Sequence, residues 1–416
     1  MRLQSEYSRN VVKVLTGTTV AQALPIAVAP ILTRLYPPEA FGVYYLYASL
    51  ASILSVAATG RYELAILLPK DEKEAFHTGL AAGWATTLFS SILFLVILPF
   101  RHSISELLGE PALAPWLYMV PLTVFIQGWY NAGNFWHNRQ KRFGVLNANR
   151  ISVSATNAGS RIGLAWVLTA SGGLIWGTLL SWLTGLVHFA AVFWKKDRKL
   201  LPTYEKAEVL KQARRFRNFP LTMVPGSLFN KGNVELPAVF LNMFFSPAVA
   251  GFFGQMNAVL RQPLLVVGRA FEEVFKQQAS EEIRTLGHCR PVFTKTIYRL
   301  SLLGALPFLL LFLFAPHLFA LVFGATWETA GTYARYFAFP LFLQFVAAPL
   351  SALFYLKEYT RWYTILEFGQ LVLVVLALFI GSALLRDPEA ALLLLAAAYT
   401  IGVSVRLFLL WKLAHK

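Results

Sequence analysis

Seven basic side chains lie within apolar stretches of this sequence, where a charge is costly, and five of them are candidates for binding a ligand. The five are Arg61, Arg161, Lys231, Arg261 and Arg269. An ionised side chain at the centre of a bilayer costs about 2.5–3.5 kcal/mol on insertion scales, so such residues usually face a partner or a polar interior. The planar fork of arginine matches phosphate oxygens. We therefore expect these five side chains to face a shared cationic cavity and to bind a phosphate or pyrophosphate group or acidic sugars.

Asparagines accompany the two arginines that lie nearest mid-span. Asn157 precedes Arg161 by four positions, and Asn257 precedes Arg261 by four. Residues four apart share one face of a helix. Both asparagines are therefore predicted to bind the same substrate. The small residues of the stretch 159–163 should also let a neighbouring helix approach closely.

Acidic residues are fewer inside the apolar stretches, and three of them are candidate sites for coupled H⁺ or Na⁺. These are Glu63, Glu235 and Glu367. Glu235 follows Lys231 by four positions, so a local ion pair is an alternative to a ligand-binding role for this lysine. Arg61 and Glu63 are two positions apart and are expected not to face each other on a helix.

Some intramembrane arginines have a second explanation, because a long side chain near a helix end can extend to the interface. Arg150 and Arg406 lie close to predicted cytoplasmic ends and are not counted as ligand-binding residues. For Arg61 and Arg269 both explanations remain open.

The elements that carry these residues are predicted to be membrane-spanning helices. The chain is 56% hydrophobic and only 14% charged, whereas a soluble protein carries about a quarter charged residues. A span needs roughly 20 apolar residues. The sequence has twelve such stretches: 13–34, 41–68, 75–99, 114–136, 151–170, 173–194, 219–242, 248–275, 296–322, 331–356, 362–383 and 390–411. We predict an all-α polytopic membrane protein with twelve transmembrane helices.

The distribution of basic residues predicts the topology. Of the 37 Lys and Arg, 26 lie in alternate gaps between stretches, four in the other gaps and seven inside the stretches. Basic loops stay in the cytoplasm, so both termini are predicted to be cytoplasmic in a multi-pass protein of the bacterial inner membrane. The net charge of +16 is then explained by topology and by attraction to membrane lipids, and no nucleic-acid partner is expected.

The longest polar segment divides the stretches six and six. It is a basic cytoplasmic linker at about 195–218 with helical spacing. We predict an N-terminal six-helix bundle at 1–208 and a C-terminal six-helix bundle at 209–416. Similar segments at 36–44 and 245–253 favour a duplication, with a pseudo-two-fold axis along the membrane normal.

Motifs for cofactor, metal or nucleotide chemistry are absent from the sequence. Cys289 is the only cysteine, and there is neither a GxxxxGK[ST] loop nor an HExxH motif. We therefore predict a transporter rather than an enzyme, with no catalytic residues, no metal site and no cofactor beyond a coupled H⁺ or Na⁺.

Four short segments carry a resemblance to a known family. The segments 15–22, 30–36, 41–42 and 58–65 resemble the start of a Wzx-type polysaccharide flippase, of the multidrug/oligosaccharidyl-lipid/polysaccharide (MOP) exporter superfamily. The resemblance implies two six-helix bundles around a central cavity and alternating access. It also implies that an undecaprenyl-pyrophosphate-linked oligosaccharide is moved from the cytoplasmic to the periplasmic leaflet for polysaccharide, lipopolysaccharide O-antigen or capsule biosynthesis. Of the candidate site residues, only Arg61 and Glu63 lie within these four segments.

The implied partners are a lipid-linked anionic oligosaccharide, membrane lipids, a polysaccharide polymerase and chain-length proteins, with the flippase itself acting as a monomer. Three other functions remain alternatives. A drug exporter of the same superfamily would be expected to carry acidic sites for cationic drugs. A flippase for lipid-linked peptidoglycan precursors would have a related substrate. A membrane polysaccharide polymerase or ligase would need a large outer loop, and the longest here, about 99–113, is roughly fifteen residues.

Overall fold

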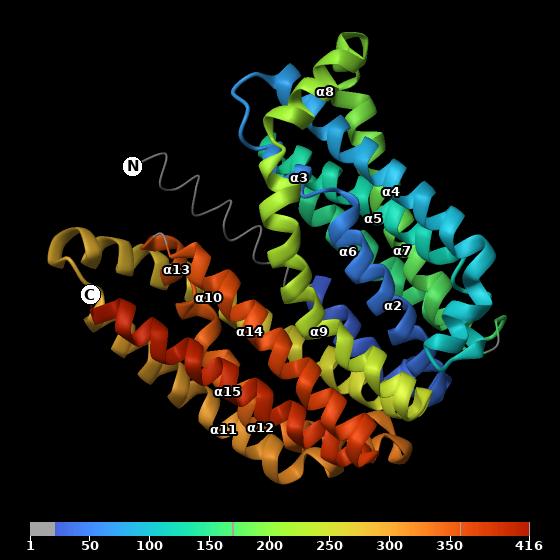
Figure 1. Cartoon of the computed structure of the whole chain (residues 1–416), viewed down its shortest axis with the longest axis vertical. Coiled ribbons are helices and arrows are strands. Elements are labelled where there is room, and N and C mark those ends of the chain that lie inside the picture. Colours follow the sequence, from blue (N-terminus) through green and yellow to red (C-terminus); the bar gives the residue numbers. More distant parts are fainter. Residues whose placement is uncertain (1–20, 169, 358, 416) are drawn as a thin grey trace. The chain divides into compact units, whose positions relative to one another are not determined.

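The computed structural model describes residues 21–168, 170–357 and 359–415, which form helices and no strands (Figure 1). The prediction of an all-α fold is confirmed. The chain divides into two compact units, Met1–Lys231 (unit 1) and Gly232–Lys416 (unit 2), with the boundary inside one helix. The first part of the flippase-like motif, 15–20, and the basic residues of the N-terminus lie outside the described residues.

Unit 1 is built on five long helices of the described residues, α2, α4, α5, α6 and α7, which pack against one another. Its elements are α2 (Pro38–Ala58), α3 (Tyr62–Ala65), α4 (Glu72–Leu107), η1 (Pro111–Leu113), α5 (Met119–Arg139), α6 (Phe143–Leu164), α7 (Gly172–Lys196), η2 (Arg198–Thr203), α8 (Lys206–Arg215), η3 (Phe219–Met223) and the start of α9 (Val224–Phe244). A helix at Ala21–Leu35 precedes them. Helix α5 packs against α2, α4 and α7, while α6 lies along α7. Helix α5 is therefore central to this unit.

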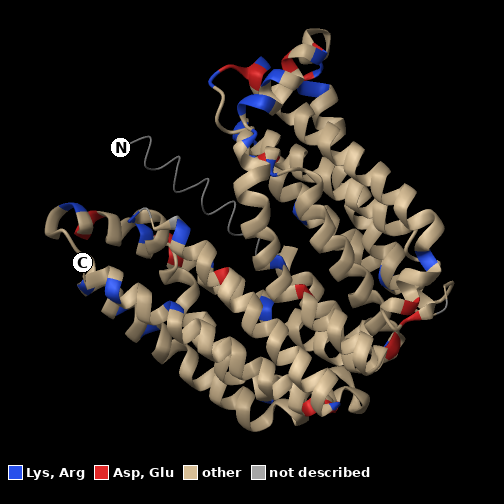
Figure 2. Ribbon diagram, viewed as in Figure 1, with Lys and Arg blue, Asp and Glu red and all other residues tan. Residues whose placement is uncertain are grey.

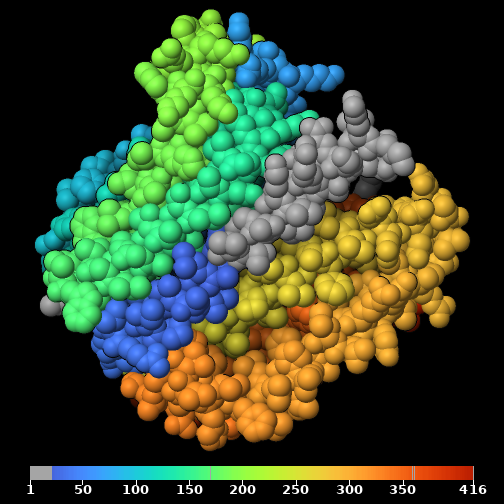
Figure 3. All heavy atoms as spheres, turned by 180° about the vertical axis from the view of Figure 1, so that it is seen from behind, coloured from blue at the N-terminus to red at the C-terminus, as the bar shows by residue number. Residues whose placement is uncertain are grey.

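Unit 2 has a comparable all-helical core. After the end of α9 come α10 (Pro247–Leu286), α11 (Arg290–Phe323), η4 (Ala325–Trp327), α12 (Glu328–Leu350), α13 (Leu353–Leu356), α14 (Thr360–Phe379), η5 (Ile380–Leu385) and α15 (Pro388–His415). Helix α12 packs against α10, α11 and α15. On the face shown in Figure 3, α10 (yellow) and α11 (orange) run side by side.

Each of the twelve predicted stretches contains helix among the described residues. Within the described part of the chain, seven helical segments are long and apolar enough to cross a membrane by length and composition. Helices α5, α6, α9 and α10 fall short of that hydropathy, and the last three carry most of the candidate ligand-binding residues. Figure 2 shows charged residues gathered toward helix ends, with long uncharged segments between them. Apart from α5, the helices of low hydropathy are thus those that carry candidate residues from the sequence analysis.

The stretch predicted at 41–68 is not one continuous helix. Helix α2 ends at Ala58, and Gly60 and Arg61 both adopt left-handed backbone conformations, with φ of 57° and 59°. Such a conformation is uncommon for a residue other than glycine. The matching stretch of the second half lies inside α10, a single helix of 40 residues. Arg61 and Arg269 occupy similar sequence positions, but their backbones differ.

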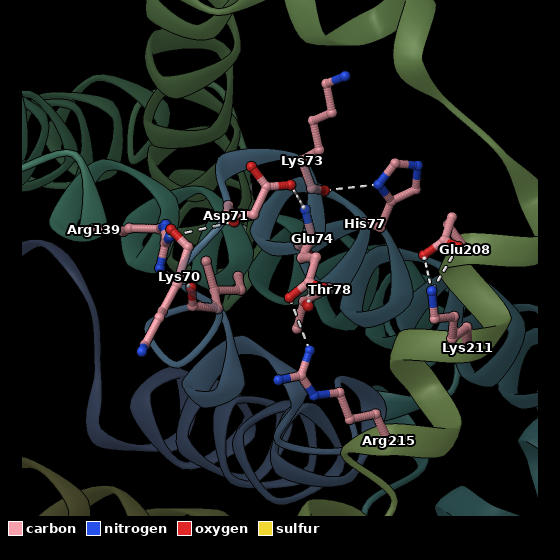
Figure 4. Close-up of polar contacts among 11 residues, drawn as sticks. Lys70, Asp71, Lys73, Glu74, His77, Thr78, Arg139, Glu208, Lys211 and Arg215 are labelled. Carbon is pink, nitrogen blue, oxygen red and sulfur yellow. Dashed lines mark hydrogen bonds and ion pairs between the residues drawn. The ribbon is translucent and has the colours of Figure 1, made fainter.

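The basic linker forms the predicted helix and packs on unit 1 (Figure 4). From α8, Arg215 forms an ion pair with Glu74 of α4 at 2.8 Å. Just before α8, the backbone N–H of Glu205 donates to Nε2 of His77 at 3.2 Å. The helical spacing of the linker is confirmed, while the division into bundles at 208/209 stays a prediction.

A buried ion pair fastens the end of α7 to α5 and α6. The carboxylate of Asp197 accepts two hydrogen bonds of 2.6 Å from the guanidinium of Arg142, just before α6. It accepts a third, of 2.8 Å, from Nε1 of Trp136 in α5. Burial alone would raise the pKa of Asp197, but these hydrogen bonds outweigh burial and hold it below its ordinary value. One carboxylate thus connects the ends of α5, α6 and α7.

Replacing one partner of this pair should destabilise the protein. In Arg142→Ala the Asp197 carboxylate, 1% exposed, loses its counter-ion, and breaking a buried pair costs about 3–5 kcal/mol. We expect a clear fall in the thermal unfolding midpoint of detergent-solubilised protein. Arg217→Ala, at an exposed residue of the linker, is the matched control and should leave the midpoint unchanged. Equal midpoints for the two variants would contradict the assignment.

The same pair predicts a stability loss in acid. Because the folded-state pKa of Asp197 is lowered, its contribution is fully present above the unfolded value of about 4 and is lost as pH falls through the folded value. Between pH 7 and pH 3 the unfolding midpoint of the wild type should therefore fall more steeply than that of Asp197→Asn. Parallel curves would show that another group controls the acid response.

Candidate functional site

Arg161 of α6 is held by hydroxyl groups rather than by a carboxylate. Its guanidinium donates to the hydroxyl of Tyr44 of α2 and, at 2.7 Å, to Oγ1 of Thr178 of α7. The guanidinium carbon also lies 4.4 Å from the centre of the Tyr44 ring. Its Nε is buried without a hydrogen-bond partner among the described residues, which also place no carboxylate in an ion pair with it. Its charge is thus held by neutral oxygens and a ring face.

Helix α7 approaches Arg161 closely at Gly177. A Cβ atom there would lie 2.5 Å from Cγ of Arg161. The expected role of the small residues 159–163 is wrong for Gly159 and Gly163, because neither has a described neighbour within 4 Å of such an atom. The close contact instead uses a glycine of the partner helix. Asn157 also faces α7, where its amide donates to Oγ of Ser181 at 3.3 Å.

Arg61 and Glu63 contact each other, contrary to expectation. A guanidinium nitrogen of Arg61 lies 3.3 Å from Oε1 of Glu63, and its Nε donates to Oγ of Ser227 at 3.0 Å. The spacing rule that excluded this pair assumes a continuous helix, and the left-handed turn at Gly60 and Arg61 removes that condition. Glu63 is 1% exposed, and its Oε2 has no hydrogen-bond partner among the described residues.

Lys231 also reaches α2. Its Nζ donates to Oγ of Ser52 at 2.7 Å. Glu235, one turn later on α9, is half-buried, and its predicted ion pair with Lys231 stays a prediction. Tyr44 and Ser52 lie eight positions apart, on one stripe of α2. Arg161 and Lys231 thus both contact α2, and Arg61 follows the end of this helix by three residues.

Sequence reasoning missed the neutral part of this arrangement. Tyr44, Ser52 and Thr178 are polar residues in apolar helices, but such residues are common and carry no charge to mark them. The available signal was the spacing of these polar residues, which places them on shared helix faces. Tyr44 and Ser52 are eight positions apart on α2, and Thr178 precedes Ser181 by three positions on α7. We name Tyr44, Ser52, Arg61, Arg161 and Lys231 the α2 cluster.

In unit 2, Arg261 borders a small cavity. Its neighbours there include Asn257, Gln344 and Tyr399. The cavity measures about 10 Å³, which is room for roughly one water molecule. The Nε of Arg261 is buried without a partner in the described part of the chain. Asn257 and Arg261 therefore lie together as predicted, in a space far smaller than a sugar. Arg269 is exposed on α10.

Glu367 is held by an arginine that sequence analysis set aside. A guanidinium nitrogen of Arg406 lies 2.7 Å from Oε1 of Glu367, and the amide of Asn233 donates to Oε2 at 3.0 Å. The assumption that Arg406 extends to the interface is wrong, because Glu367 lies within reach on α14. The carboxylate of Glu367 is 2% exposed and already carries a cationic partner. Its role in cation coupling stays a prediction.

The five basic candidates fall in both units. Arg61, Arg161 and Lys231 belong to unit 1, and Arg261 and Arg269 belong to unit 2. That all five face one cavity stays a prediction. The described residues contain no group of three or more His, Cys, Asp or Glu placed to hold a metal ion. The chemistry that the α2 cluster can supply is the binding of anionic oxygens by basic and hydroxyl groups.

Removing the partner of Glu367 should destabilise unit 2 and should be reversible by removing both charges. Arg406→Met leaves a buried carboxylate unpaired, at a cost of about 3–5 kcal/mol. In Glu367→Met/Arg406→Met no buried charge remains, so the thermal unfolding midpoint should recover most of the loss. If the double variant were less stable than Arg406→Met, the ion pair would not explain the effect.

Comparisons with known proteins agree with this architecture. A model of the family described as polysaccharide biosynthesis protein matches residues 31–331. No curated protein matches the sequence significantly. One similar solved structure is the inward-facing conformation of a multidrug resistance MATE family transporter of the MOP superfamily, at 16% identity and a TM-score of 0.61, covering 96% of this chain and 94% of that one.

Two further structures are comparably similar. The outward-facing conformation of a multidrug resistance MATE family transporter has 15% identity, a TM-score of 0.63 and coverage of 97% and 95%. A MOP superfamily transporter from Pyrococcus furiosus has 16% identity, a TM-score of 0.61 and coverage of 98% and 94%. Identities this low show the fold alone. The predicted relation is confirmed: the chain has the MOP transporter fold and belongs to the polysaccharide biosynthesis protein family.

Proposed function

We propose that this protein is a flippase that moves a lipid-linked anionic oligosaccharide from the cytoplasmic to the periplasmic leaflet of the bacterial inner membrane. The family match favours a role in polysaccharide biosynthesis, and the MOP fold favours transport over catalysis. Two structural neighbours are described as inward-facing and outward-facing, which supports alternating access. The substrate would be an oligosaccharide linked to undecaprenyl pyrophosphate.

The observation that carries the proposal is the hydroxyl environment of Arg161. A guanidinium paired with a buried carboxylate would have to give up a strong ion pair before it could bind an anion. Arg161 would exchange hydrogen bonds to the neutral hydroxyls of Tyr44 and Thr178 for ion-pair contacts with phosphate oxygens, which its planar fork can bind through two donors at once. When the substrate leaves, the two hydroxyls take its place.

Arg61 supplies a route for coupling to a cation. A phosphate that binds Arg61 competes with Glu63 for the same guanidinium. A buried carboxylate that loses its counter-ion is costly, so substrate binding would favour a replacement cation, H⁺ or Na⁺, at Glu63. We therefore rank Glu63 above Glu235 and Glu367 as the coupling site.

The polar and apolar parts of the substrate would take different routes across the membrane. The glycan and the pyrophosphate need a polar, cationic passage, whereas the lipid tail can remain in the bilayer. An inside-negative potential favours outward movement by about 2.3 kcal/mol per charge per 100 mV, if the full field is crossed. We expect a monomer that works beside a polysaccharide polymerase and chain-length proteins, among membrane lipids and without nucleic acid.

A drug exporter remains the second candidate, because structural neighbours are described as multidrug resistance transporters. Cationic drugs call for acidic binding groups. In the α2 cluster the charged groups are Arg61, Arg161 and Lys231, and the acid nearby, Glu63, pairs with Arg61. The excess of basic over acidic groups favours an anionic substrate. A lipid-linked peptidoglycan precursor is also anionic, so a flippase for that precursor stays an alternative.

Export should depend on the charge and fork of Arg161. Arg161→Ala should reduce glycan export by about 10- to 100-fold, since a hydrogen bond to a charged group contributes about 1.5–3 kcal/mol. Arg161→Lys should restore part of the activity, because it keeps the charge but not the two-pronged donor. The measurement is surface glycan in a strain that lacks its own flippase, with Arg299→Ala, at an exposed residue of α11, as the matched control.

Two outcomes would count against the proposal. Normal export by well-folded Arg161→Ala would remove Arg161 from the binding site. Complementation of a strain lacking the peptidoglycan-precursor flippase, or drug resistance without glycan export, would transfer the function to the corresponding alternative. Protein level and unfolding midpoint must match the wild type in each case, which separates a binding effect from misfolding.

A further inference from the structure

Unit 1 has an apolar groove that is separate from the α2 cluster. It lies between α4, α5 and α7 and has a volume of about 390 Å³, within the usual range of ligand pockets, about 300–1,000 Å³. Its lining is mainly apolar and includes six aromatic side chains, Phe76, Trp129, Trp136, Phe189, Phe193 and Trp194. The groove opens at the surface, because Trp194 is 59% exposed and Leu201 40%.

The polar groups inside this groove are already engaged. Nε1 of Trp129 donates to Thr87, and Nε1 of Trp136 donates to Asp197. Nε2 of His137 is hydrogen-bonded to the carbonyl of Phe189. A peptide or a sugar would therefore find no partners for its own polar groups there, and burying such groups without partners is unfavourable. A hydrocarbon chain carries no such groups.

The rim of the groove is strongly basic. Directly after Trp194 come Lys195, Lys196, Arg198 and Lys199, all exposed. The single acid among them is buried and neutralised by Arg142. Figure 2 shows basic and acidic residues together at the end of unit 1 that carries α8. Basic pockets between transmembrane helices on the cytoplasmic side suit anionic lipid headgroups, and tryptophan is enriched at that depth.

We propose that this groove is a binding site for an anionic phospholipid, with one acyl chain between α4, α5 and α7 and the phosphate among the four basic side chains of the rim. Lipid there would also cover the apolar face beside the buried pair of Arg142 and Asp197. The proposal is independent of the transported substrate, because it uses none of the residues of the α2 cluster.

The test is native mass spectrometry of delipidated full-length protein, titrated with phosphatidylglycerol or phosphatidylethanolamine of identical acyl chains. The wild type should hold one phosphatidylglycerol with a preference of about tenfold or more over the zwitterionic lipid, since each basic residue near a membrane surface favours anionic lipid. Ala190→Trp fills the groove from an exposed lining position and should remove this bound lipid. Ala191→Trp, exposed but outside the lining, is the matched control.

Charge is tested separately from shape. Glutamine at Lys195, Lys196, Arg198 and Lys199 should reduce the preference for phosphatidylglycerol to about twofold or less. The same change at Lys206, Lys211, Arg214 and Arg217, exposed residues of the linker, should leave it intact. Equal lipid retention in Ala190→Trp and Ala191→Trp, or an unchanged preference in the first charge variant, would overturn the proposal. Displacement of phosphatidylglycerol by equimolar undecaprenyl phosphate would also overturn it, by assigning the groove to a polyprenyl tail.

Discussion

The high cost of an ionised group away from water governs the arrangement of the polar residues in this protein. Three different solutions occur in one chain. Glu367 and Arg406 neutralise each other inside unit 2. Asp197 is shared by Arg142 and Trp136 at the end of α7. Among the residues that the structure describes, the guanidinium of Arg161 contacts hydroxyl groups and an aromatic face, and forms no ion pair. The first two arrangements suit structural roles, whereas the third leaves a charge that an incoming anion can complete.

Much of the fold could be predicted because it depends on composition along the chain. The length of an apolar stretch and the basic residues in the gaps beside it can be read from short windows of sequence. The membrane-spanning helices and the linker helix could therefore be predicted. The helices with low hydropathy, such as α6 and α10, were still recognised because their few charges interrupt otherwise apolar segments.

The partners of the charged residues could not be predicted in the same way. Arg161 meets Tyr44 across 117 positions and Arg406 meets Glu367 across 39, and no local spacing rule relates such residues. The error at Arg61 and Glu63 has a different origin. A helical spacing rule was applied across a position where the backbone turns left-handed, and a glycine next to an arginine does not by itself reveal that turn, since Gly268 and Arg269 continue a helix.

The length of α10 has a mechanical consequence. At about 1.5 Å per residue, its 40 residues span roughly 60 Å along the helix, about twice the thickness of the hydrocarbon core. Pro263 lies inside this helix, between Arg261 and a packed core around Phe275 and Ala279 near the far end, and an interior proline removes a backbone hydrogen bond and kinks a helix. A change of angle at Pro263 would therefore displace the far end of α10 by more than the residues next to the proline.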